Sequence, residues 1–252
     1  QRLPPRFVRM TLLRKILIGL LVVVVAGGLF IAWAMRGDPA QYTLDQLSGP
    51  KPKLAEPSAQ TIPTVVVAEP VGWKANEAPV AAQGLAVGRF ADGLDHPRAV
   101  TVLSNGDVLV AETNAPPGRG PGGITGLVMN WLFRKVGAGG PSPNKIVLLR
   151  DTNGDGKADQ KFVMDNPALD SPFGMVFRDG RLIIANHNAV LSYPYALGQT
   201  NLAGKPEKLM DLPGGGNHWA RNLLLSADGS KLYVTVGSSS NIAENGIDQE
   251  KG

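Results

Sequence analysis

The sequence predicts an all-β protein of the β-propeller class, preceded by one N-terminal transmembrane helix. Three segments, residues 95–114, 170–188 and 217–237, repeat an apolar strand, an Asn-Gly or Asp-Gly turn and a second apolar strand. These dipeptides favour the tight turns that match the twist of paired strands. The 31 glycines and 20 prolines suit a turn-rich β protein better than a helical bundle. Repeats at this spacing indicate propeller blades, which bury their faces against one another.

Composition excludes several classes of function. The 252 residues allow one large domain or two small ones. With no cysteine in the chain, disulfides, thiolate catalysis and Cys-ligated metal sites are excluded. The net charge of +4 is modest, and no basic stripe is interleaved with aromatic residues, so we expect no nucleic-acid partner.

Residues 16–35 contain no charge and predict the transmembrane helix, since about 20 residues span a bilayer. The basic residues within 1–15 predict a cytoplasmic N-terminus, with everything after Arg36 on the other side. A cleaved signal peptide is the rival, because positions 32–34 read Ala-Trp-Ala, but signal cores usually have about 7–15 apolar residues. We therefore expect an uncleaved anchor in a bacterial inner membrane and a periplasmic domain.

The remaining chain divides into a linker and a domain. Residues 36–63 are rich in proline and alanine and read as a tether. From residue 64 onward short β-like runs dominate, so residues 64–252 are assigned to a partial propeller. Three repeats do not close a propeller, which has about 4–8 blades. We therefore expect further blades after Gly252.

An insertion at residues 115–143 separates the first two repeats. It is rich in glycine and proline at both ends, and its centre, LVMNWLFRKV at 127–136, predicts a short amphipathic helix. A surface excursion packed on a blade, a lid over a site, and a contact with membrane or partner remain alternatives.

Aligning the repeats places His96, Ser171 and His218 at equivalent positions, just before the first strand. In a propeller such positions lie on one face around the central channel. An imidazole there can take or give a proton near neutral pH, so His218 is interpreted either as a general base or as a structural residue. His96 and His187 are expected to be structural or loop residues.

Three other residues are candidates to line the same pocket. Arg221 could reach an anion such as a cofactor if its strand begins after it; otherwise it packs within the blade. Glu112 and Asn186 stand in the polar ends of second strands.

Residues 151–159, DTNGDGKAD, place side-chain oxygens around glycines. Asp151, Asn153, Asp155 and Asp159 resemble the first half of an EF-hand loop, which binds Ca²⁺. The twelfth position is Phe162 in place of glutamate, which excludes a complete EF-hand. A structural Ca²⁺ and a tight turn held by Asx side chains are both open.

The stretches GGGNHWARNLLLSADGSKLYVTVGSSSN, HPRAVTVLSNGDVLVAET and LLRDTNGDGKAD together resemble the quinoprotein sugar dehydrogenases. The resemblance spans roughly residues 84–252 and is closest to the membrane-anchored sorbosone dehydrogenase-like group, related to soluble glucose dehydrogenase. It implies a six-bladed propeller with pyrroloquinoline quinone (PQQ) on its top face and Ca²⁺ bridging cofactor and protein. It also makes His218 the general base that takes the hydroxyl proton of a sugar while hydride passes to the quinone.

The resemblance also implies limits. Soluble glucose dehydrogenases have aspartate directly before this histidine, whereas this chain has Asn217, so glucose does not follow as the substrate. Asn217 and Glu112 are the candidate substrate contacts. The family's basic contacts to the quinone and its cofactor calcium ligands lie beyond Gly252, and the 151–159 loop is not that calcium site. A membrane quinone or a cytochrome is the expected electron acceptor.

Two other functions are compatible with a propeller. One is a non-catalytic module that binds a protein or a glycan at the periplasmic surface. The other is a metal-dependent lactonase, for which Glu112 and Asn186 are the candidate ligands.

Overall fold

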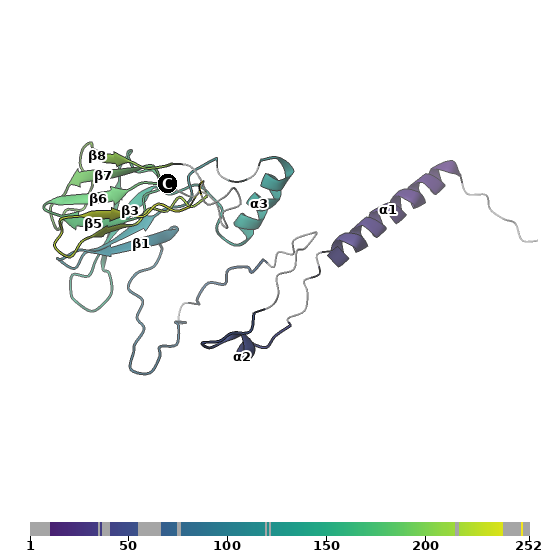
Figure 1. The fold of residues 1–252 in the computed structure, drawn as a ribbon, viewed down its shortest axis with the longest axis horizontal. Coiled ribbons are helices and arrows are strands. Elements are labelled where there is room, and N and C mark those ends of the chain that lie inside the picture. Colours follow the sequence, from purple (N-terminus) through teal and green to yellow (C-terminus); the bar gives the residue numbers. More distant parts are fainter. Residues whose placement is uncertain are drawn as a thin grey trace, which may run out of the picture. The chain divides into compact units, whose positions relative to one another are not determined.

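The structure is a computed structural model that describes residues 11–34, 36, 41–54, 67–74, 77–118, 120, 122–214, 217–238 and 248. The chain divides into two compact units, Gln1–Ala68 and Glu69–Gly252. The first unit contains helices α1 (Leu12–Ala34) and α2 (Leu44–Leu47). The second contains helix α3 (Gly123–Lys135) and the ten strands assigned in the described residues (Figure 1).

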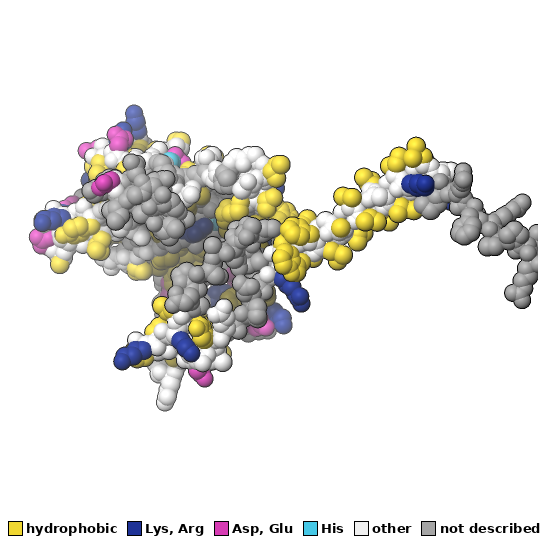
Figure 2. Space-filling model, turned by 45° about the vertical axis from the view of Figure 1, so that its right-hand side comes forward, with side chains coloured by type: hydrophobic (Ala, Val, Ile, Leu, Met, Phe, Trp, Pro, Cys, Tyr) yellow, Lys and Arg dark blue, Asp and Glu magenta, His cyan; other side chains and the backbone are white. Residues whose placement is uncertain are grey.

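Helix α1 is apolar and exposed along its whole length. None of its residues is buried, and Figure 2 shows hydrophobic side chains covering it. It begins at Leu12, before the predicted residue 16, and so includes Arg14 and Lys15. By length and composition it can cross a membrane, either as an anchor or as a signal sequence.

The strands form two four-stranded antiparallel sheets, each in chain order, and one hairpin. The first sheet contains β1 (Pro97–Val102), β2 (Val108–Glu112), β3 (Lys145–Arg150) and β4 (Gln160–Asp165). The second contains β5 (Met175–Arg178), β6 (Arg181–Ala185), β7 (Ala189–Pro194) and β8 (Glu207–Asp211). The hairpin is β9 (Leu223–Leu225) with β10 (Leu232–Val234). The three predicted hairpins are therefore confirmed as the first strand pair of each sheet.

Turn residues fix the register of these hairpins. Asp179 and Gly180 have φ of 49° and 72°, the left-handed conformations that a two-residue turn requires at both positions. In the third hairpin Gly229 has φ of 67°, and the Asp228 carboxylate accepts hydrogen bonds from the Ser226 hydroxyl and from Ser230. These bonds, that from Ser226 first, lower the pKa of Asp228 to about 2.

The sheets pack face to face, because alternate residues along each strand point to opposite sides. One core lies between the first and second sheets and contains Leu109, Ile146, Leu148, Leu182, Ile184 and Tyr193. The other face of the second sheet packs on the hairpin through Ala185, Val190, Leu223 and Leu232. Residues 90–94 cover the outer face of the first sheet.

The first strands of successive sheets are neighbours: β1 contacts β5, and β5 contacts β9. The Thr101 hydroxyl donates to the Met175 carbonyl at 2.9 Å, and the Gly174 amide donates to the Arg221 carbonyl at 2.9 Å. The architecture is therefore all-β, with stacked antiparallel sheets and no closed barrel among the described residues. This stacking is compatible with propeller blades.

Candidate functional site

His218 is exposed in the segment before β9, and one hydrogen bond orients its ring. Its Nδ1 lies 2.9 Å from the carbonyl oxygen of Ser238. Since a carbonyl oxygen can only accept, Nδ1 carries the proton, and Nε2 of the neutral ring presents a lone pair. The ring is therefore arranged to accept a proton at Nε2.

Arg221 holds the backbone that precedes β9. Its guanidinium is buried and donates from Nη1 to the carbonyls of His218 (2.6 Å) and Ala220 (3.2 Å), and from Nη2 to that of Pro213 (2.7 Å). The planar fork of arginine suits several acceptors at once. Because β9 begins only at Leu223, Arg221 precedes the strand, and it turns toward the backbone. Its contact with a cofactor stays a prediction.

Two glycines allow the close packing of the His218 segment. A Cβ added at Gly237 would overlap with the Cβ of His218. One added at Gly214 would lie 3.3 Å from Cβ of Asn188 and 3.7 Å from the His187 ring. Close packing is thus observed at Gly214, whereas positions 215–216 lie outside the described residues.

A second histidine lies at the adjoining edge of the second sheet. His187 Nε2 is 3.0 Å from a carboxylate oxygen of Asp170, and its amide donates to the Asp170 carbonyl at 3.2 Å. Within the described part of the chain, His187 Nδ1, Ser171 Oγ and Asn186 Oδ1 are buried without a hydrogen-bond partner. The sequence singled out Ser171 and Asn186 separately but missed the pairing of His187 with Asp170, because this pair joins the start of β5 to the end of β6. The Asp-Ser-Pro of residues 170–172, which repeats the Asp-His-Pro of 95–97, was the available signal.

The equivalent positions of the first two repeats share a local conformation. His96 and Ser171 have φ of 49° and 46°, both left-handed. His96 Nδ1 lies 2.6 Å from a carboxylate oxygen of Asp95, its sequence neighbour. His218 is not among the described residues with positive φ, so the third repeat departs locally from the first two.

The other predicted contacts lie in two places. Asn217 is exposed beside His218. Glu112 belongs to the first sheet, where it is buried, and one of its carboxylate oxygens accepts the Asp95 amide at 2.9 Å. The substrate roles of both residues stay predictions.

The 151–159 loop is organised by hydrogen bonds to its own backbone. Asp151 accepts the amides of Gly154 (2.7 Å) and Gly156 (2.8 Å), and the Gly156 bond first of all lowers the pKa of Asp151 below its usual value. The side-chain oxygen of Asn153 accepts a hydrogen bond from the Asp155 amide at 2.9 Å. The carboxylate of Asp159 accepts hydrogen bonds from the amide and the hydroxyl of Thr152. This geometry supports the interpretation of a tight turn.

No group of three or more acidic or histidine side chains in the described part of the chain could hold a metal ion. The carboxylates of the 151–159 loop accept backbone amides instead, and Glu112 and Asn186 form no such group for a lactonase. Calcium at this loop stays a prediction that the described geometry does not favour.

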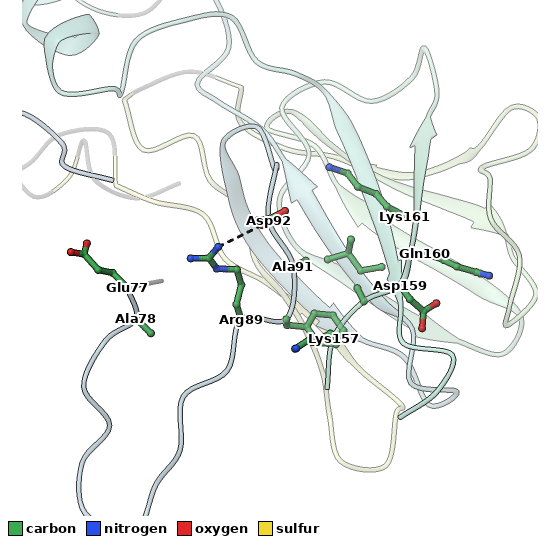
Figure 3. A pocket seen from close by; sticks show the side chains of 12 residues that line it. Glu77, Ala78, Arg89, Ala91, Asp92, Lys157, Asp159, Gln160 and Lys161 are labelled. Atoms are coloured by element: carbon green, nitrogen blue, oxygen red, sulfur yellow. Dashed lines mark ion pairs between the residues drawn. The ribbon is translucent and has the colours of Figure 1, made fainter. Parts of the chain in front are cut away.

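A cavity of about 630 Å³ lies elsewhere, between the chain preceding β1 and strand β4. Figure 3 shows Arg89 directed at Asp92, an ion pair of 3.6 Å; Lys157 and Lys161 also line the cavity. Apart from Asp159, no predicted site residue lines this cavity. It is therefore separate from the edge that carries His218.

No protein-family model and no curated protein matches the sequence. Among solved structures, the holo PQQ domain of pyranose dehydrogenase from Coprinopsis cinerea is 19% identical, with a TM-score of 0.47 over 66% of this chain and 34% of that chain. Two structures of a Trichoderma reesei carbohydrate-active enzyme of family AA12, with iodide and with calcium, are each 19% identical with a TM-score of 0.46. They match over 68% of this chain and 38% and 37% of theirs. The chain thus spans little more than a third of these proteins.

Proposed function

We propose that this protein is a membrane-anchored quinoprotein dehydrogenase that oxidises a sugar or a related alcohol or aldehyde, with His218 as general base. One observation carries the proposal: Nδ1 of His218 donates to the Ser238 carbonyl, which leaves the Nε2 lone pair as proton acceptor on an exposed ring. PQQ, when bound, would supply the hydride acceptor.

The chain's own residues would position the substrate and take up its hydroxyl proton. Nε2 of His218 takes the proton of the substrate hydroxyl, and the Ser238 carbonyl then faces an imidazolium, whose N–H it stabilises more strongly than that of a neutral ring. Arg221 donates to the carbonyls of His218 itself and of Pro213 before it, which holds the ring in one place. Asn217, next to His218, is the proposed substrate contact.

The polar atoms of the adjoining edge fit part of a cofactor site. Ser171 Oγ, Asn186 Oδ1 and His187 Nδ1 are buried with hydrogen-bonding capacity left over, and such groups usually find a partner. A polar ligand such as PQQ would supply one. The described residues of this edge include no cluster of cationic side chains that could pair with the carboxylates of PQQ. Ser171, Asn186 and His187 are therefore the proposed contacts from this part of the chain.

The proposal also covers where the protein is located and how its sheets close into a propeller. Helix α1 would anchor the chain, with the sheets closing into a six-bladed propeller on the periplasmic side. Support comes from the basic residues before and within α1 and from the repeated face-packed sheets. A membrane quinone or cytochrome would reoxidise the cofactor.

The test is dye-linked oxidation of a panel of sugars and alcohols by the protein in membrane vesicles, with and without added PQQ and Ca²⁺. We expect activity only with PQQ, a loss of about 10²- to 10⁴-fold in His218→Gln, and little change in His96→Asn. His96→Asn is the matched control because asparagine tolerates the left-handed φ at this position. PQQ-independent activity, or full activity in His218→Gln, would contradict the proposal.

A further inference from the structure

Helix α3 has two apolar sides, and only one of them is used inside the protein. Gly126 is buried, and Met129 and Leu132 are half-buried, so they form the inner side. The outer side contains four large apolar residues with high exposed fractions: Ile124 (81%), Leu127 (72%), Val128 (50%) and Trp131 (60%). Their i, i+3, i+4, i+7 spacing places them on one continuous stripe.

The charged residues of α3 are all basic and lie at its C-terminal end. The helix contains no acidic residue, and Arg134 and Lys135 occupy its last turn. Lys135 Nζ lies 5.6 Å from the centre of the Trp131 ring and forms a 2.9 Å ion pair with Glu69. Both partners of this pair are exposed, so it contributes little stability. An apolar stripe that includes Trp, next to basic side chains, is typical of helices that lie in a membrane interface.

Contiguous apolar surface of this kind marks an interaction site in a soluble domain. The same chain contains α1, long and apolar enough to span a bilayer. If α1 is inserted, the tether holds α3 at a high effective concentration next to lipid, so weak docking becomes favourable. We propose that α3 docks on the bilayer that holds α1, with its outer stripe in the acyl–headgroup boundary and its basic end on anionic headgroups.

This docking would set the direction of the site edge. The insertion containing α3 leaves the first sheet after β2, and hydrogen bonds join its two ends. The Asn114 amide donates to the Ser142 hydroxyl at 3.0 Å, and the Asn114 side chain donates to the Gly140 carbonyl at 3.1 Å. Figure 1 shows α3 beyond the strand ends. The starts of β1, β5 and β9 belong to the same edge, so this edge would face the membrane surface. The proposal rests on the proposed membrane insertion of α1 but not on the proposed enzymatic activity.

Spin labelling tests it directly, because the chain contains no cysteine of its own. A nitroxide on Leu127→Cys reports the stripe, and one on Ser104→Cys, in the β1–β2 turn at the opposite edge, is the matched control. Both variants are made in the whole chain, reconstituted in phosphatidylcholine vesicles with phosphatidylglycerol. We expect the label at 127 to be relaxed more strongly by oxygen than by a water-soluble nickel chelate, and the label at 104 to show the reverse.

Equal access of the nickel chelate to both labels would overturn the proposal. So would a label at 127 that neither reagent reaches, since another protein surface would then cover the stripe. A thermal melt equal to that of the unlabelled protein confirms that each variant is folded.

The headgroup contact has its own test. Arg134→Gln should lower the ratio of docked to undocked protein roughly five-fold in vesicles with phosphatidylglycerol and leave it unchanged in pure phosphatidylcholine. Arg89→Gln removes an exposed arginine away from α3 and should have no effect in either. An equal loss in both variants would mean that net charge, rather than the basic end of α3, governs docking.

Discussion

Arg221 donates a 2.6 Å hydrogen bond from Nη1 to the backbone carbonyl of His218, three residues before it. The side chain of a buried cation therefore sets the backbone position of the exposed imidazole. With the Nδ1–Ser238 bond, this contact holds His218 from two sides. The first two predictions concern these two restraints.

Arg221→Met keeps an apolar chain of similar length but removes the donors to His218, Ala220 and Pro213. Those carbonyls lose charged partners in a buried place, so we expect the free energy of unfolding to fall by about 3 kcal/mol. Urea denaturation measures this. Unchanged stability would show that the hydrogen bonds of the guanidinium do not stabilise the fold.

Gly237→Ala introduces a Cβ that overlaps with Cβ of His218. We expect the ring to move away from Ser238 and oxidation of substrate to drop about 100-fold, as for an ångström-scale misplacement of a catalytic group. The imidazole ¹⁵N shifts should then lose the pattern of a fixed Nδ1–H tautomer. Wild-type shifts with wild-type activity would contradict the close packing of Gly237 on His218.

Gly174→Ala tests the contact between β5 and the segment leading into β9. A Cβ at Gly174 would lie 2.5 Å from the Leu223 amide nitrogen and 2.8 Å from the Arg221 carbonyl oxygen, and backbone cannot yield as a flexible side chain can. We expect a loss of about 3 kcal/mol in the free energy of unfolding. Gly88→Ala is the control, because no atom of the described residues lies within 4 Å of its added Cβ, and it should change stability by less than about 1 kcal/mol. Equal effects of the two variants would refute the close approach.

An ion pair between the buried Asp107, just before β2, and the half-buried Arg150 at the end of β3 makes stability depend on pH. Arg150 binds both carboxylate oxygens of Asp107, at 2.6 and 2.8 Å, and these hydrogen bonds hold the pKa of Asp107 below its usual value. A depressed carboxyl pKa stabilises the fold above the unfolded-state pKa, and this contribution is lost as pH falls through the folded-state pKa. Asp107→Asn should cost roughly 3 kcal/mol at neutral pH. The difference from wild type should shrink on acidification, and a pH-independent difference in urea melts would argue against the pair.

Local signals predicted the hairpins. Asp179-Gly180 requires two left-handed residues, which only a few dipeptides tolerate, and the structure has this turn where the pattern placed it. The helix of the insertion was also predicted, but it begins at Gly123 rather than at 127. Gly123 and Gly126 are poor helix formers, so the sequence pattern did not place the start of the helix there.

Long-range contacts were not predictable in this way. The pairing of His187 with Asp170 depends on the register of β5 with β6, and the orientation of His218 depends on Ser238, which lies beyond the β9–β10 hairpin. Arg221 illustrates the same limit, because its spacing from His218 fitted several orientations, and only the start of β9 at Leu223 decides between them.

The most direct measurement is rescue of His218→Ala with free imidazole in the PQQ- and Ca²⁺-supplemented oxidation assay. If Nε2 of His218 is the proton acceptor, the variant should lose about 10²- to 10⁴-fold in rate, and imidazole should restore part of it in a saturable manner. Pyrazole, a much weaker base of similar size, should not. A variant that keeps most of its activity, or one that pyrazole rescues as well as imidazole, would contradict the assignment of His218 as the base.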